Sequence, residues 1–182
     1  TTLKLNQTIT FSSLSSKTYG DASFTLSATG GDSGNPVTFV SSNPSVATVS
    51  GNTVTVVGQG TTTITASQVG NSTYYDAPDV QQNLTVNRKT IDVTADAQTK
   101  TYGDTDPALT YTFSPALVSG DSFSGTLKRA AGEDIGPYAI NQGTLALSSN
   151  YTLNYTGADL TIGKKTIDVT ADSQTKTYGD TD

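Results

Sequence analysis

Nearly all the acidic side chains of this chain, which are its main candidates for catalysis or metal binding, are aspartates. Fifteen of its sixteen acidic residues are Asp, the other is Glu133, and His and Cys are absent. Ser-His-Asp and Cys-His catalysis, zinc–thiolate sites and His-based metal sites are therefore excluded. Paired carboxylates for glycoside hydrolysis would have to be Asp pairs or Glu133 with Asp134. Glu133 and Asp134 lie in a Gly- and Ala-rich stretch that predicts an exposed loop, where burial cannot separate two carboxyl pKa values. The sequence predicts that the protein is not an enzyme.

Calcium is the cofactor that these acids suit best, because it binds carboxylate and carbonyl oxygens. Asp104 and Asp106 stand one residue apart, a spacing found in calcium-binding loops. Against this, the chain has no Asp-x-Asp-x-Asp-Gly loop, and Lys100 stands four residues before Asp104. Two interpretations stay open: a calcium site at Asp104 and Asp106, or solvated carboxylates in a turn. No other cofactor is predicted.

Two tyrosines are candidates for ligand contact. Tyr74 and Tyr75 are adjacent in a predicted loop at 68–78, and a second loop is predicted at 133–138. Aromatic rings with a polar hydroxyl suit glycan or protein surfaces. A net charge of −6 argues against nucleic acid as a partner. No run of 18 apolar residues is present, so no membrane-spanning segment is predicted in this stretch of chain.

Three copies of the pentapeptide Lys-Thr-Tyr-Gly-Asp organise the chain, and the structural elements must be placed around them. They stand at residues 17–21, 100–104 and 176–180. Around the second and third copies the match widens to eighteen residues, 89–106 against 165–182, with one difference. Such self-similarity marks a tandem array. We predict domains at 1–87 and 88–163, and at 164–182 the first strand and turn of a further repeat.

Each pentapeptide is predicted to be a structural turn between strands. Its glycine can take a positive φ, and its aspartate can accept a hydrogen bond from a backbone N–H two residues on. Its tyrosine should pack the ring against the edge of the core and keep the hydroxyl on a polar partner. The motif residues are Tyr19, Gly20 and Asp21 in the first copy, Tyr102, Gly103 and Asp104 in the second, and Tyr178, Gly179 and Asp180 in the third.

The predicted fold class is all-β, with tandem small sandwich domains. The chain contains 34 Thr and 20 Ser, and β-branched Thr suits the solvent face of a strand. In 90–95, Ile91, Val93 and Ala95 alternate with polar residues, the pattern of a half-buried strand. The same alternation in 61–67 predicts a strand with Ile64 and Ala66 facing inward and the threonines that alternate with them facing outward. Short strands about ten residues apart in the first domain are typical of an antiparallel sandwich. The second domain could be either a sandwich or a grasp-like sheet.

Two stretches resemble known bacterial families. Residues 41–50 (SSNPSVATVS), followed by 51–57 and 60–67 (GTTTITAS), resemble the bacterial immunoglobulin-like domain of type 2. Residues 89–162 resemble the MBG repeat of YGX type, through the second pentapeptide, the Asp-Pro that follows it and the closing Leu-Thr-Ile. The resemblances imply adhesins and other long proteins that are secreted or displayed on the bacterial surface.

The boundary between the domains carries no flexible spacer. Residues 86–90 read Val-Asn-Arg-Lys-Thr, and a basic pair recurs at Lys164 and Lys165. We expect abutting domains in a semi-rigid rod, with the basic pairs facing Asp residues of the neighbouring unit. The predicted function is a non-enzymatic, extracellular stalk or fibre-forming segment. Its partners would be neighbouring repeats of the array, or other copies through strand pairing by 164–182. The alternatives are a module that binds a glycan or host protein, and an accessory region of a secreted enzyme.

Overall fold

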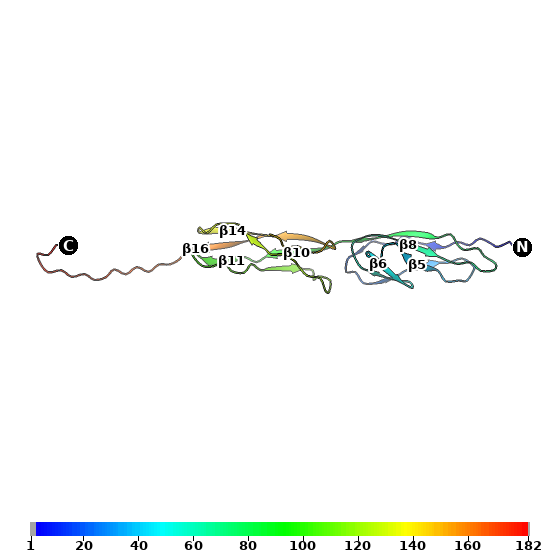
Figure 1. The fold of residues 1–182 in the computed structure, drawn as a ribbon, viewed down its shortest axis with the longest axis horizontal. Helices are drawn as coiled ribbons and strands as arrows, with labels where there is room; N and C mark the ends of the chain where they lie inside the picture. The colour runs from blue at the N-terminus through cyan, green and yellow to red at the C-terminus, as the bar shows by residue number, and fades with distance from the viewer. Residues whose placement is uncertain (1–2, 182) are drawn as a thin grey trace.

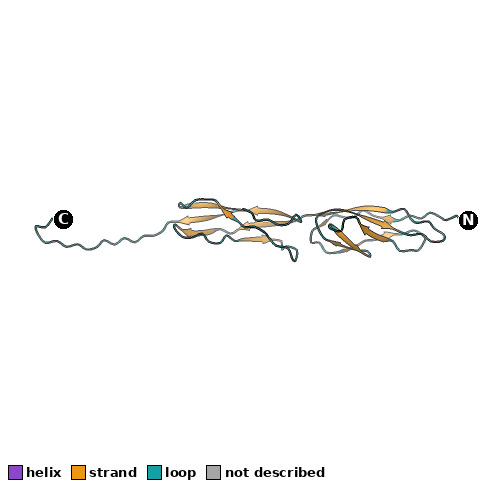
Figure 2. Ribbon diagram, in the orientation of Figure 1, coloured by secondary structure: helices purple, strands orange, loops and turns teal. Residues whose placement is uncertain are grey.

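Two β-sandwich domains follow one another along the chain, and an extended tail follows the second (Figure 1). The computed structural model describes residues 3–181. Thr1, Thr2 and Asp182, which belong to the predicted segments, lie outside the described residues. All the regular elements of the described part are strands (Figure 2), and it contains no helix long and apolar enough to cross a membrane.

The first domain is formed by two main sheets and one short strand pair. One sheet runs in the order β2 (Lys17–Thr18), β9 (Val80–Asn87), β8 (Gly60–Ser67), β5 (Thr38–Ser41). The other runs in the order β3 (Phe24–Thr25), β7 (Thr53–Val56), β6 (Ala47–Ser50). The short pair joins β1 (Thr10–Phe11) to β4 (Ala28–Thr29).

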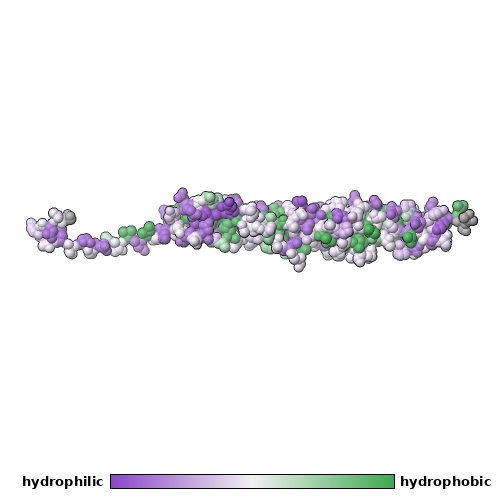
Figure 3. Space-filling view, viewed as in Figure 1, coloured by the Kyte–Doolittle hydropathy of each residue, from purple (hydrophilic) through white to green (hydrophobic). Residues whose placement is uncertain are grey.

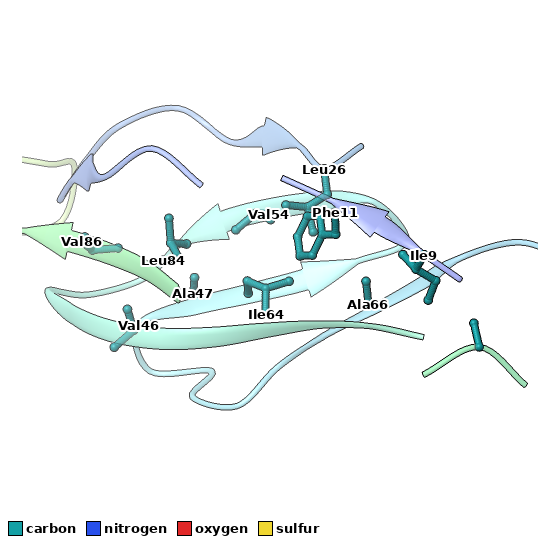
Figure 4. Close-up of a cluster of buried hydrophobic side chains, with 11 residues drawn as sticks. Ile9, Phe11, Leu26, Val46, Ala47, Val54, Ile64, Ala66, Leu84 and Val86 are labelled. Carbon is teal, nitrogen blue, oxygen red and sulfur yellow. The ribbon is translucent and has the colours of Figure 1, made fainter. Parts of the chain in front are cut away.

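Alternating side chains of these sheets form the first core. Ile64 and Ala66 of β8, Leu84 of β9 and Val54 of β7 are fully buried and point into one cluster with Phe11 (Figure 4). Every second residue of β8 from Thr62 onward faces inward, because successive strand side chains point to opposite faces. The predicted alternation in 61–67 is confirmed.

The second domain has the same two-layer plan. One sheet runs in the order β12 (Tyr111–Ser114), β10 (Lys89–Ala95), β15 (Tyr151–Thr156). The other runs in the order β11 (Gln98–Thr101), β16 (Ala158–Gly163), β14 (Gly136–Asn141), β13 (Lys128–Arg129). Between them lies a core that includes Ile91, Val93, Ile140, Leu160 and Ile162. The domain is a sandwich, and the grasp-like alternative is not adopted.

The expectation of a purely antiparallel first sandwich is wrong in one pairing. β2 lies parallel to the end of β9, and in the second domain β11 lies parallel to the end of β16. β2 and β11 each contain the first two residues of a pentapeptide, whereas the third parallel pair, β10 with β15, contains none. Parallel neighbours run toward the same end of a sheet, so each Tyr-Gly-Asp is placed where the last strand leaves its domain.

The tail continues from β16 as a single extended segment (Figure 3). Within its described residues, 164–181, no strand forms and all side chains are exposed. Ile167 is 77% exposed and Val169 is 89% exposed. Their counterparts in the matching stretch 89–106, Ile91 and Val93, are fully buried. Of the two expected partners for the tail, the second domain does not pair with it in this structure.

Candidate functional site at the domain junction

The first pentapeptide places a tyrosine at the junction of the two domains. Tyr19 N donates to Asn87 O at 2.9 Å, which anchors the turn to the last residue of β9. Only Arg88 separates β9 from β10. The Tyr19 ring therefore stands at the exit of the first domain, beside the strand that enters the second.

Tyr19 packs against side chains of both domains. Its ring meets that of Tyr151 edge-on, with centroids 5.4 Å apart and an interplanar angle of 87°. Its hydroxyl donates to Asp121 Oδ2 at 3.0 Å, and the Tyr151 hydroxyl donates to the same oxygen at 2.5 Å. Val118 N donates to the Tyr151 hydroxyl at 2.9 Å. One carboxylate thus links a tyrosine of the first domain to a tyrosine buried in the second.

Close backbone approach completes the contact. Gly20 has a φ of +89°, and a Cβ there would lie 2.6 Å from Val118 Cγ2, so both the backbone conformation and the available space call for glycine. Asn150 accepts from Gln59 N through Oδ1 and from Lys89 N through its carbonyl, each at 3.0 Å. The second domain is therefore bonded to a loop of the first as well as to its pentapeptide.

Burial and the shared carboxylate keep the two hydroxyls protonated. Burial is the larger cause and the hydrogen bond to Asp121 the smaller one, and together they raise the pKa of Tyr151 to about 12. The same two causes, in the same order, raise the pKa of Tyr19. Both tyrosines therefore remain neutral donors to Asp121 at physiological pH.

The basic pair at the boundary does not supply the contact. Among the ion pairs of residues 3–181, none involves Arg88 or Lys89. The expectation that this pair faces Asp residues of the next unit is wrong, because the carboxylate at the junction, Asp121, is held by two tyrosines. Ring packing and hydrogen bonds orient the domains in its place.

The other two pentapeptides form the same turn but leave their tyrosines uncovered. In each copy the aspartate N–H donates to the carbonyl three residues earlier, at 2.9 to 3.1 Å: Asp21 to Thr18, Asp104 to Thr101 and Asp180 to Thr177. The predicted turn and its positive-φ glycines are confirmed. The Asp21 side chain accepts from Thr18 N at 2.8 Å, three residues before it and not two residues after it as expected.

The expectation that each tyrosine packs on its own core edge holds for Tyr19 only. Tyr102 is 50% exposed and Tyr178 is 103% exposed. The Tyr102 turn lies where β16 ends, and Tyr178 lies in the exposed tail. Tyr19 is partly buried because a second domain lies there, and the rings of Tyr102 and Tyr178 have no such neighbour in this structure.

Asp106 lies in a cluster of four charges at the far end of the second domain. Its carboxylate accepts from Lys100 Nζ at 2.7 Å and from Arg129 Nε at 2.6 Å, and Glu133 pairs with the same two cations. The hydrogen bond from Arg129, and to a smaller extent the one from Lys100, lower the pKa of Asp106 to about 2. The hydrogen bond from Lys100, and to a smaller extent the one from Arg129, lower the pKa of Glu133.

This arrangement bears on the calcium hypothesis. Asp104 accepts a hydrogen bond from Lys100 Nζ through its backbone carbonyl, at 3.1 Å. In the part of the chain that the structure describes, no three His, Cys, Asp or Glu side chains are grouped so that they could hold a metal ion. A calcium ion at Asp106 would have to displace two cationic partners, which carry the charge that calcium would supply.

Two measurements test the role of Asp106. We expect Asp106→Asn to lower the melting midpoint of the second domain at pH 7, because Lys100 and Arg129 lose a shared partner. The pKa of Asp106 is depressed, so its contribution is present above about pH 4 and is lost as the pH falls through about 2. The variant and the unmutated chain should therefore converge in acid. Asp104→Asn is the control. A midpoint that rises with calcium, and no longer rises in Asp106→Asn, would establish a calcium site instead.

The structure separates the two loops predicted to contact a ligand. Tyr74 forms a bridge with Leu5, and Tyr75, 51% exposed, has Lys4 Nζ at 5.9 Å from its ring centroid. This loop lies near the N-terminal end of the chain, whereas 133–138 lies at the tail end of the second domain (Figure 1). The prediction of a loop there is wrong for 136–138, which are the first residues of β14. The two loops do not form a single surface, and ligand contact by Tyr74 and Tyr75 stays a prediction.

Sequence reasoning missed the residues that receive Tyr19. Asp121, Val118 and Asn150 belong to none of the motifs found in the sequence. Tyr151 lies on the same face of β15 as Leu153 and Tyr155, and it is buried. No signal in the sequence pairs Tyr151 with a residue 132 positions earlier.

Comparison with known proteins agrees with the two-domain order. Residues 18–69 match the intimin immunoglobulin-like domain, and residues 91–161 match the MBG domain of YGX type. The first match is to the intimin family, not to the type 2 family named from the sequence, and both are immunoglobulin-like. These matches indicate a structural module of the surface or adhesion type. A search of curated proteins gives no match.

Among solved structures, the chain is similar to Drosophila N-cadherin EC1-4. The identity is 9%, the TM-score is 0.33, and the alignment covers 87% of this chain and 51% of the cadherin. The chain therefore spans about half the length of that protein. The superposition is too distant to contribute to the functional argument.

Proposed function

We propose that this chain, in which an intimin-type immunoglobulin-like domain precedes an MBG domain of YGX type, is a semi-rigid segment of a long extracellular bacterial protein. Its task would be mechanical: the segment sets the reach and stiffness of a stalk, and recognition is carried elsewhere. The observation that carries the proposal is the docking of Tyr19 onto Tyr151 and Asp121 beside a one-residue linker.

The contacts at the junction favour the docked arrangement of the domains. An edge-on aromatic pair contributes about 0.5–1.5 kcal/mol, and a hydrogen bond to a charged group about 1.5–3 kcal/mol. Because about 1.4 kcal/mol corresponds to a tenfold ratio of populations, each contact shifts the balance toward the docked arrangement by about twofold or more. The hydrogen bonds of Asn150 to Gln59 and Lys89 act in the same direction.

Spin-label distances across the junction test the proposal. The chain has no cysteine, so Thr48→Cys in the first domain and Thr152→Cys in the second provide two labelling sites on exposed strand positions. We expect a narrow distribution of label distances. Tyr19→Ala should broaden it, because the ring and the hydroxyl both lose their partners.

Tyr102→Ala is the matched control, since it removes the same residue of the same pentapeptide at the far end of the second domain. It should leave the distribution unchanged. A distribution that is already broad in the unmutated chain would contradict a semi-rigid segment.

A further inference from the structure

The exit of the second domain repeats the backbone geometry of the first junction. Tyr102 N donates to Gly163 O at 2.9 Å, as Tyr19 N donates to Asn87 O at 2.9 Å. The parallel pairing of β11 with β16 corresponds to that of β2 with β9. Gly103 has a φ of +86°, against +89° at Gly20. The second domain therefore presents a tyrosine and a turn in the form that the first domain uses for docking.

What differs is the surface in front of the turn. A Cβ on Gly20 would lie 2.6 Å from Val118 Cγ2, whereas a Cβ on Gly103 would meet no atom within 4 Å. Tyr102 is 50% exposed, while Tyr19 packs against both cores. The surface of Tyr102 and Gly103 thus lacks the cover that Tyr151, Asp121 and Val118 give the first turn.

The residues that follow Gly163 identify what would cover this surface. Lys164 takes the place of Arg88, and residues 165–182 repeat 89–106 with one difference, Ser173 for Ala97. At the first junction, 89–106 opens the domain that supplies the receiving residues. A repeat opened by 165–182 and completed as in 107–163 would bring its own counterparts of Val118, Asp121 and Tyr151 to the same place.

We infer that the Tyr102–Gly103 surface is the docking site for another domain of the same kind as residues 89–163, joined directly through Lys165. The inference rests on the proposed function and extends it. All junctions of the array have the same geometry, and the pentapeptide of each domain contacts the domain that follows it.

The test completes the repeat that begins at Lys165. The full chain is extended after Asp182 by a copy of residues 107–163, and spin labels are placed in the second domain and in the added one. We expect a narrow distance distribution that Tyr102→Ala broadens. Tyr178→Ala, which removes the tyrosine that is now at the free exit, is the matched control and should change nothing.

Hydroxyl-radical footprinting gives an independent measurement. In the 182-residue chain, Tyr102 and Tyr178 should both react; in the extended chain, Tyr102 should be protected and Tyr178 should stay reactive. A Tyr102 that remains reactive, or a second-junction distribution that Tyr102→Ala leaves unchanged, overturns the inference. Labels across the first junction of the same protein report separately on the proposed function: a narrow first junction beside a broad second one overturns this inference alone.

Discussion

Replacing Ile91 by Ala is expected to destabilise the second domain by about 2–5 kcal/mol, whereas Ile167→Ala should leave the stability unchanged. Both residues stand in the sequence Lys-Thr-Ile-Asp-Val-Thr-Ala. Ile91 is fully buried in β10, between β12 and β15, and truncation would leave a cavity. Ile167 is 77% exposed and packs against no core, so its truncation removes no buried contact.

Hydrogen exchange at individual amides, measured at increasing urea concentration, would quantify the two effects, because it reports the stability of each domain separately. A large loss of stability in Ile167→Ala would show that the tail folds against a partner. If that loss appeared only at high protein concentration, the partner would be another copy of the chain, bound by strand pairing through 165–171.

The second large effect is expected from Tyr151→Phe, which keeps the ring and removes the hydroxyl. The hydroxyl donates to Asp121 and accepts from Val118 N, so its loss should cost the second domain about 1–3 kcal/mol at pH 7. Tyr102→Phe, at the far end of the domain, is the matched control and should be close to neutral. Denaturant titrations of the three proteins would measure the differences.

The same substitution should remove an alkaline loss of stability. The pKa of Tyr151 is raised to about 12 in the folded chain, against about 10 in the unfolded chain. The neutral phenol therefore contributes its full stability below about pH 10 and loses it as the pH rises through about 12, to a total of about 2–3 kcal/mol. Without the hydroxyl this loss disappears, so the variant and the unmutated chain should converge between about pH 10 and 12. Parallel profiles over that range would contradict the hydrogen-bonded arrangement of Tyr151 and Asp121.

Local regularities of the sequence predicted much of the fold. The alternation in 90–95 and 61–67 predicted strands with the correct inward faces, because a strand places every second side chain on one side. The short boundary at 86–90 predicted abutting domains, and Arg88 is the single residue between β9 and β10. The parallel pairing of β2 with β9 was not predictable, since it joins residues about 70 positions apart in the chain.

The candidate site was only half visible in the sequence. The pentapeptide identified Tyr19 and Gly20, but their partners Asp121 and Tyr151 lie in another domain and belong to no repeated motif. The spacing of Asp104 and Asp106 suggested calcium, whereas folding brings Arg129 to Asp106 and supplies a cation from the protein itself. In both cases the deciding contact joins residues that folding alone brings together.

The repeated eighteen residues separate what the sequence by itself determined from what tertiary structure decided. The pentapeptide forms the same turn in the second domain and in the exposed tail, with φ of +86° at Gly103 and +94° at Gly179. Its closing hydrogen bond joins groups three residues apart, so the local sequence is enough. The stretch before it is a buried strand at 89–95 and carries no strand at 165–171. A strand bonds its backbone and buries its apolar face only against residues far along the chain, and only a completed domain provides them.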